Sequence, residues 1–164
     1  MGLFAFIKEA GEKLFGGGEA KAAQDAAREN PSADNLKRAN DAAGDAIKVY
    51  IESLGLTATG LTVTFSDAHA TVYGIAPNQQ TKEKIILAAG NVEGVAGVHD
   101  QMTVEVTEPE AVFYTVVKGD NLSKIAKAHY GDANKYPAIF EANKPMLKHP
   151  DKIYPGQVLR IPPQ

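Results

Sequence analysis

The sequence between residues 113 and 131 reads FYTVVKGDNLSKIAKAHYG. Residues 114–116 predict a strand, and Asp120 or Asn121 is then placed to cap a helix, because both side chains accept hydrogen bonds from a first helical turn. Gly131 is a typical residue for the end of that helix. Apolar and aromatic residues recur at helical spacing and predict one buried face: Leu122, Ile125, Ala126, His129 and Tyr130.

The remaining C-terminal residues complete a small domain. Residues 136–142 predict a second short helix. The sequence DKIYPGQVLRIP at 151–162 predicts a Pro-Gly turn, followed by a closing strand over 158–161. Residues 113–162 are therefore expected to form a domain with the order strand, helix, helix, strand.

A second small domain is expected over residues 41–107. Residues 41–54 and 81–89 show the helical spacing of apolar residues, and each segment ends at a glycine. Residues 61–72 alternate about a turn and predict a hairpin, and residues 102–106 alternate again as a last strand. The order helix, strand, strand, helix, strand predicts a two-layer sandwich, so the chain belongs to the α+β class with two small domains.

Three further segments complete the organisation. Residues 1–15 predict a short amphipathic helix that docks on protein, since its charges cancel instead of being basic as at a membrane surface. Residues 16–40 predict a flexible connection rich in Ala and Gly, with transient helix on either side of Pro31. Residues 108–112 are expected to be a hinge between the two domains.

Charge divides the chain into an acidic and a basic part. Residues 1–111 carry 9 Lys and Arg against 16 Asp and Glu, whereas residues 112–164 carry 8 against 4. The basic part can attract nucleic acid, the two parts can attract each other, or both can stay separately solvated. We expect the two parts to dock within a monomer, through attraction that salt weakens, because the tether keeps them at high effective concentration. No nucleic-acid partner is expected.

Composition also limits the chemistry. The 164 residues include no cysteine, so a disulfide or a cysteine-ligated metal site cannot form. No catalytic motif occurs, and the protein is not expected to be an enzyme. The four histidines lack the spacing of zinc ligands: His69, His99, His129 and His149.

The start of the chain predicts its compartment. Its apolar run is short, no basic residue precedes it, and Lys8 and Glu9 interrupt it, which is unlike a secretory signal. No apolar run approaches the roughly 18 residues of a membrane-spanning helix. We therefore expect a cytoplasmic protein without a membrane span.

The C-terminal domain resembles a LysM domain from end to end, through residues 113–126, Asn143 and residues 151–162. LysM domains bind polymers of N-acetylglucosamine between the loop after their first strand and the loop before their last. Glycan-binding LysM proteins are normally exported, and the start of this chain departs from that. A turn, a helix cap and a strand turn explain the same loops without a ligand. The resemblance implies this groove: Gly119, Asp120, Asn121, Leu122, Ile153, Tyr154 and Pro155.

Residues 41–107 resemble a BON domain. The likeness lies in the order of elements, in Val72-Tyr73-Gly74 after the hairpin, and in residues 94–98 before the last strand. A BON domain followed by a LysM domain, behind the start MGLFAFIKEAGEKLF, resembles a family of bacterial cytoplasmic potassium-binding proteins. The resemblance implies a protein that binds potassium, changes conformation, and senses or buffers the ion in osmotic or ionic stress. The alternative is a cell-envelope module that binds peptidoglycan.

The same resemblance implies a potassium site made of main-chain carbonyls. Such oxygens can replace the water shell of this large ion, and they are unpaired at helix ends, where the helix dipole also favours a cation. Gly90 is expected to be a C-cap glycine with positive φ. By sequence alone, Gly90 and Gly94 are better explained as a cap glycine and a turn glycine, without an ion. The implied donors are the carbonyls of Ile7, Lys8, Ala10, Gly90, Val92 and Val95.

Overall fold

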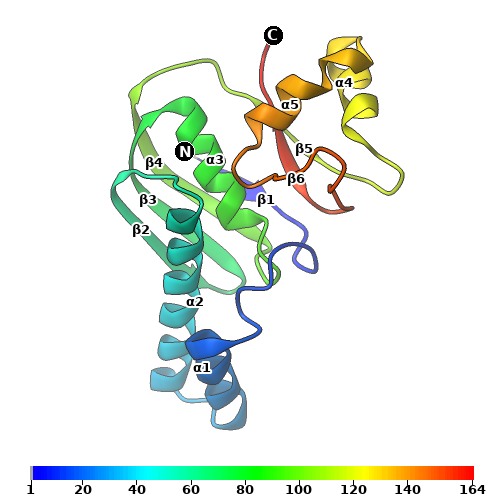
Figure 1. Cartoon of the computed structure of the whole chain (residues 1–164). Helices are drawn as coiled ribbons and strands as arrows, with labels where there is room; N and C mark the ends of the chain where they lie inside the picture. The colour runs from blue at the N-terminus through cyan, green and yellow to red at the C-terminus, as the bar shows by residue number, and fades with distance from the viewer. Residues whose placement is uncertain (1) are drawn as a thin grey trace.

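The computed structural model describes residues 2–164 and contains two α+β domains, as predicted (Figure 1). In the N-terminal domain, strands lie in the order β1-β4-β3-β2, and two helices cover one face of this sheet. β2 and β3 form an antiparallel hairpin, whereas β3 and β4 are parallel and joined through α3. The elements are β1 Leu3–Ala5, α2 Ala33–Ser53, β2 Thr59–Ser66, β3 His69–Asn78, α3 Gln79–Gly90 and β4 Gly97–Val106.

The predicted helix over residues 1–15 is wrong. Residues 3–5 form β1, which pairs antiparallel with β4, and Met1 lies outside the described residues. Phe4 and Phe6 turn toward the core while Leu3 is exposed, so burial alternates as in a strand. The hydrogen bonds of β1 satisfy the edge of β4, which would otherwise be unpaired.

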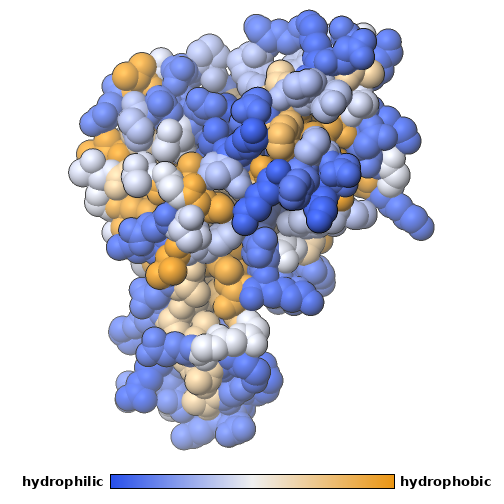
Figure 2. All heavy atoms as spheres, viewed as in Figure 1, coloured by the Kyte–Doolittle hydropathy of each residue, from blue (hydrophilic) through white to orange (hydrophobic). Residues whose placement is uncertain are grey.

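Residues 16–40 are mostly helical, so the predicted flexible connection is wrong, whereas the helix predicted on either side of Pro31 is present. α1 spans Gly18–Glu29, and α2 begins after Ser32, whose hydroxyl accepts a hydrogen bond from the Asn35 amide at 3.1 Å. α1 packs along the first half of α2, and Pro31 lies in the turn between them. α1 and the first half of α2 project from the domain, and Figure 2 shows pale orange, mildly hydrophobic residues between polar side chains on this projection. Alanine supplies both the helix propensity and the close packing.

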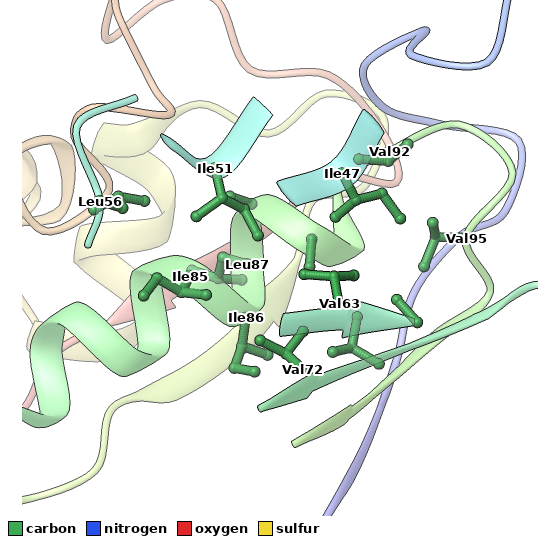
Figure 3. Close-up of a cluster of buried hydrophobic side chains, with 14 of the residues drawn as sticks. Ile47, Ile51, Leu56, Val63, Val72, Ile85, Ile86, Leu87, Val92 and Val95 are labelled. Carbon is green, nitrogen blue, oxygen red and sulfur yellow. The ribbon is translucent and has the colours of Figure 1, made fainter. Parts of the chain in front are cut away.

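The core of the N-terminal domain lies between its helices and its sheet (Figure 3). Each fully buried aliphatic side chain contributes about 1.5–3 kcal/mol relative to an exposed one. These side chains come from both helices and from the hairpin, as the two-layer prediction requires: Ile47, Ile51, Val63, Val72, Ile85, Ile86 and Leu87.

The C-terminal domain has its own smaller core and the predicted order of elements. The Asn121 side chain accepts a hydrogen bond from the Lys124 amide at 2.8 Å, and Gly131 ends the helix with a φ of 75°, so both local predictions are confirmed. Gly156 has a φ of 90°, as a type II turn requires. The elements are β5 Val112–Thr115, α4 Leu122–Tyr130, a short 3-10 helix Ala133–Lys135, α5 Tyr136–Ala142 and β6 Val158–Ile161.

Candidate functional site

The structure brings the two predicted carbonyl segments side by side. The Gly94 amide donates to the Lys8 carbonyl at 2.7 Å, and the Glu12 amide donates to the Asn91 carbonyl at 2.9 Å. The Glu93 amide in turn donates to the Glu12 carbonyl at 2.9 Å. Residues 7–12, which follow β1, therefore run along the loop that follows α3.

A glycine makes this close approach possible. Gly11 has a φ of +118°, and a Cβ atom there would lie 2.5 Å from the carbonyl carbon and oxygen of Asn91. Any other residue would thus be strained in its backbone and would collide with the facing loop. Gly94 also has positive φ, at +102°. Sequence reasoning did not single out Gly11, although it lies inside the MGLFAFIKEAGEKLF start.

The expected reason for a glycine at position 90, a C-cap with positive φ, is wrong. Gly90 is the last residue of α3 and has no positive φ, and the C-cap is Asn91 with a φ of −82°. Glycine is required there because a Cβ atom would overlap the ring of Phe6. The physical cause is therefore close packing between β1 and α3, and not a left-handed turn.

The side chains of the loop fix its backbone in place. Val92 and Val95 are fully buried in the domain core, so only their main chain can take part in a site (Figure 3). The carbonyl of Val92 accepts the Val95 amide at 3.0 Å, and that of Ile7 accepts the Ala10 amide at 3.1 Å. A carbonyl oxygen has a second lone pair, so one accepted hydrogen bond does not by itself prevent it from binding a cation.

Side-chain clusters offer no rival site. Within residues 2–164, no group of three or more His, Asp or Glu residues is arranged to hold a metal ion. The rings of His69 and His99 lie 5.6 Å apart on neighbouring strands, without a third ligand of this kind. Main-chain carbonyl oxygens are a different kind of ligand, and they suit an alkali ion.

The first loop of the predicted glycan groove is occupied by contacts within its own domain. The Asp120 carboxylate accepts the Tyr114 hydroxyl at 2.6 Å and the Val117 amide at 3.0 Å. The Tyr114 hydrogen bond, and then that of Val117, holds the pKa of Asp120 below its usual value. Leu122 is buried in the core, and the Gly119 carbonyl accepts the Lys124 ammonium at 3.0 Å.

The second loop of that groove faces the N-terminal domain. Ile153 packs on the core of its own domain, and Pro155 is exposed. Tyr154 is half-buried in a groove that Glu12 and Tyr50 also line. Burial raises the pKa of Tyr154 to about 12, and the negative charge of Glu12 adds to the rise. The two loops of the predicted glycan groove thus have different neighbours.

The two domains meet through helix α3 and strand β6. Arg160 of β6 donates from Nη2 and Nε to Glu83 of α3 at 2.8 and 3.1 Å, and both side chains are almost fully buried. After the end of α3, Asn91 donates from Nδ2 to the Val158 carbonyl and accepts the Val158 amide at Oδ1, both at 2.8 Å.

Sequence reasoning missed these interface residues. One signal was present, because Arg160 interrupts the apolar strand over 158–161, where all four residues are buried. A charge inside such a strand requires a buried partner. Its identity depends on tertiary packing, since Glu83 is distant in the sequence.

Comparison with known proteins agrees with both domain resemblances. A BON domain model matches residues 40–106, and a LysM domain model matches residues 114–162. The chain is 45% identical over 165 residues to the potassium binding protein Kbp of Escherichia coli, and the match covers 99% of both chains. None of the helices in residues 2–164 has the length and apolar character needed to cross a membrane.

Two shorter matches concern parts of larger proteins. An uncharacterized protein of Deinococcus radiodurans is 53% identical over 49 residues, which are 30% of this chain and 19% of that protein. An esterase of Mycobacterium tuberculosis is 39% identical over 74 residues, which are 43% of this chain and 16% of the esterase.

Proposed function

The chain belongs to the family of the potassium binding protein Kbp, and we propose that it binds potassium ions and is not an enzyme. The observation that carries the proposal is the pairing of residues 7–12 with the loop after α3, through the Gly94 to Lys8 and Glu12 to Asn91 hydrogen bonds. The proposed donors are the carbonyls of Ile7, Lys8, Ala10, Gly90, Val92 and Val95.

The chemistry of these oxygens suits potassium. Neutral carbonyls can replace the loosely held water of a large monovalent ion. The second segment follows the C-terminus of α3, where unpaired carbonyls and the helix dipole favour a cation. Burial of Val92 and Val95 and the close approach at Gly11 hold both segments in one geometry, so little ordering is needed on binding.

We further propose that potassium favours the docked arrangement of the two domains. Asn91 lies inside the proposed carbonyl loop, and its side chain holds the backbone of Val158 in the LysM domain. An ion that stabilises this loop would therefore stabilise the contact with β6. Such a protein would act in the cytoplasm as a monomeric sensor or buffer of potassium in osmotic or ionic stress.

A thermal melt tests the proposal directly. The full chain is melted in potassium, sodium or lithium chloride at equal ionic strength, and titration calorimetry then gives the affinity. At a potassium concentration of about 100 times the dissociation constant, binding contributes about 2.7 kcal/mol, or roughly 5–10 °C for a chain of this size. Equal melting temperatures in the three salts would contradict the proposal.

A second candidate is binding of N-acetylglucosamine polymers, which the LysM match over residues 114–162 favours. Tyr154 lies against the N-terminal domain, so a glycan on that loop would compete with docking. Glycan binding there would therefore require the two domains to separate. Titration with chitin oligomers in potassium and in sodium separates the two functions. Glycan affinity that is higher in sodium would support a role for the LysM groove in the undocked state.

A further inference from the structure

Among the buried side-chain nitrogen and oxygen atoms of the described residues, one has no hydrogen-bond partner, the oxygen Oε1 of Gln157. Gln157 is 4% exposed, so bulk water does not compensate for the missing partner. A buried amide oxygen is costly to leave unpaired, and native structures usually pair it with a donor, a water molecule or an ion. Gln157 Oε1 is therefore open to a partner of this kind.

Gln157 lies where the LysM domain touches both proposed carbonyl segments. At the residue before it, Gly156, a Cβ atom would lie 2.8 Å from the Cβ atom of Ala10 and 3.3 Å from that of Ile7. The residue after it, Val158, exchanges two hydrogen bonds with Asn91. The neighbours of Gln157 on either side thus contact residues 7–11 and the loop after α3.

Gln157 is one of the residues that line the interdomain groove, with Glu12, Tyr50, Asn91 and Tyr154, and the groove has a volume of about 370 Å³. The negative charge of the exposed Glu12 carboxylate adds to the burial that raises the pKa of Tyr50 and Tyr154, so its field reaches both tyrosines. Lys148 and Lys152 also line the groove, and both are exposed. An unpaired amide oxygen can act as a ligand for a cation.

We propose that Gln157 Oε1 is an oxygen of the potassium site contributed by the LysM domain, in contact with the ion or with a water molecule bound to it. A side-chain amide oxygen is a neutral donor like the main-chain carbonyls, and potassium accepts both. The ion would then join the two domains and satisfy the unpaired oxygen. This inference rests on the proposed function, and it adds a side chain to a site otherwise made of backbone.

The test is Gln157→Met, which keeps the length of the side chain and removes the amide oxygen. In sodium the variant should melt at the wild-type temperature or above it, because an unpaired buried acceptor is gone. Its potassium affinity should fall about tenfold, through loss of one oxygen ligand. Gln101→Met is the matched control, since Gln101 is exposed on β4, and it should change neither quantity.

A structural role for Gln157 gives the opposite result. Gln157→Met would then lower the melting temperature in sodium and leave the potassium affinity unchanged, and either finding overturns the inference. If the variant does not fold, nuclear magnetic resonance of the wild-type chain decides instead. The side-chain amide signal of Gln157 should shift on titration with potassium while that of Gln101 stays, and an unmoved Gln157 signal overturns the inference.

Failure of the proposed function and failure of this inference give different results. If the wild-type chain shows no response specific to potassium, the proposed function fails and this inference fails with it. If the wild-type chain binds potassium and Gln157→Met binds it equally well, only the contribution of Gln157 is overturned.

Discussion

Strand β6 is held at two points along α3, by a charged contact at one and a neutral contact at the other. In the first half of the helix, the charged side chains of Glu83 and Arg160 form a buried ion pair. Just after the helix ends, the neutral side chain of Asn91 pairs with the backbone of Val158. Two residues of one short strand are thus held by two different kinds of contact.

The difference indicates how docking and ion binding can coexist. A buried guanidinium beside the carbonyl loop would repel a cation, and such repulsion is strong where water is excluded. The fold places Arg160 toward the start of α3 and a neutral amide at its carbonyl end. The charge asymmetry of the sequence predicts that salt weakens the attraction between the two domains. Within residues 2–164, however, the ion pair between the domains is buried. Salt should therefore affect docking only weakly.

The largest loss of stability is expected when the charged contact between Glu83 and Arg160 is broken. Glu83→Gln keeps the shape of the side chain but leaves Arg160 buried without an opposing charge. Removal of one partner of a buried pair costs about 3–5 kcal/mol, so the domains should separate. Urea melts should show a lower midpoint, and small-angle scattering should show a longer particle.

The rescue variant distinguishes charge from packing. Glu83→Met combined with Arg160→Met removes both charges and fills a similar volume, and it should recover most of the lost stability. A single Glu83→Gln variant that remains docked and as stable as the wild type would show that the ion pair does not hold the domains together.

The second prediction concerns the loop of carbonyls after α3, where Gly11 approaches Asn91 closely. Gly11→Ala places a methyl group against the Asn91 carbonyl at a φ of +118°, which costs about 1–3 kcal/mol in strain and should abolish potassium binding. Lys8→Ala is the matched control, because only its carbonyl is a proposed donor and its side chain is exposed. It should keep or slightly strengthen binding by removing a positive charge. Calorimetry that finds binding lost in Lys8→Ala but kept in Gly11→Ala would contradict a backbone site.

The third prediction removes the neutral contact. Asn91→Ala leaves the amide and carbonyl of Val158 without their partners, at a cost of about 1–3 kcal/mol. The carbonyls of the loop remain, so potassium should still bind, but it should no longer draw the domains together. Scattering in potassium and in sodium measures this coupling, and a change in shape as large as in the wild type would exclude Asn91 as the link.

The sequence predicted best what local chemistry decides. Asn121 and Gly131 mark the ends of α4 by their own hydrogen bonding and φ, so no distant contact is needed to recognise them. β1 was mistaken for a helix because it is only three residues long and its partner, β4, is distant in the sequence. The sequence of α1 predicts a connection because its alanines have few large apolar neighbours, and its packing on α2 appears only in three dimensions.

The candidate site was named through resemblance and not through its residues. Main-chain oxygens have no side-chain signature, so six carbonyls cannot be recognised from composition or spacing. The close approach at Gly11, the Phe6 ring against Gly90 and the two hydrogen bonds of Asn91 all depend on segments that the fold brings together. Sequence reasoning therefore gave the two segments but not the contacts that join them.

The last and smallest prediction concerns a contact that touches neither end of α3. Tyr114→Phe removes the hydroxyl that donates to Asp120, at a cost of about 0.5–1 kcal/mol, because water competes for this partly exposed pair. The hydrogen bond lowers the pKa of Asp120 from its usual 3.8 and raises that of Tyr114 from 10.0. Its contribution is thus present between these values, and it is lost as the pH falls through the lowered pKa or rises through the raised one. Urea melts from pH 3 to pH 11 should show a difference from the wild type that is greatest in the middle and shrinks at both ends. The potassium shift in melting temperature should equal that of the wild type, and a reduced shift would show that the LysM domain acts on the ion through more than Gln157 and strand β6.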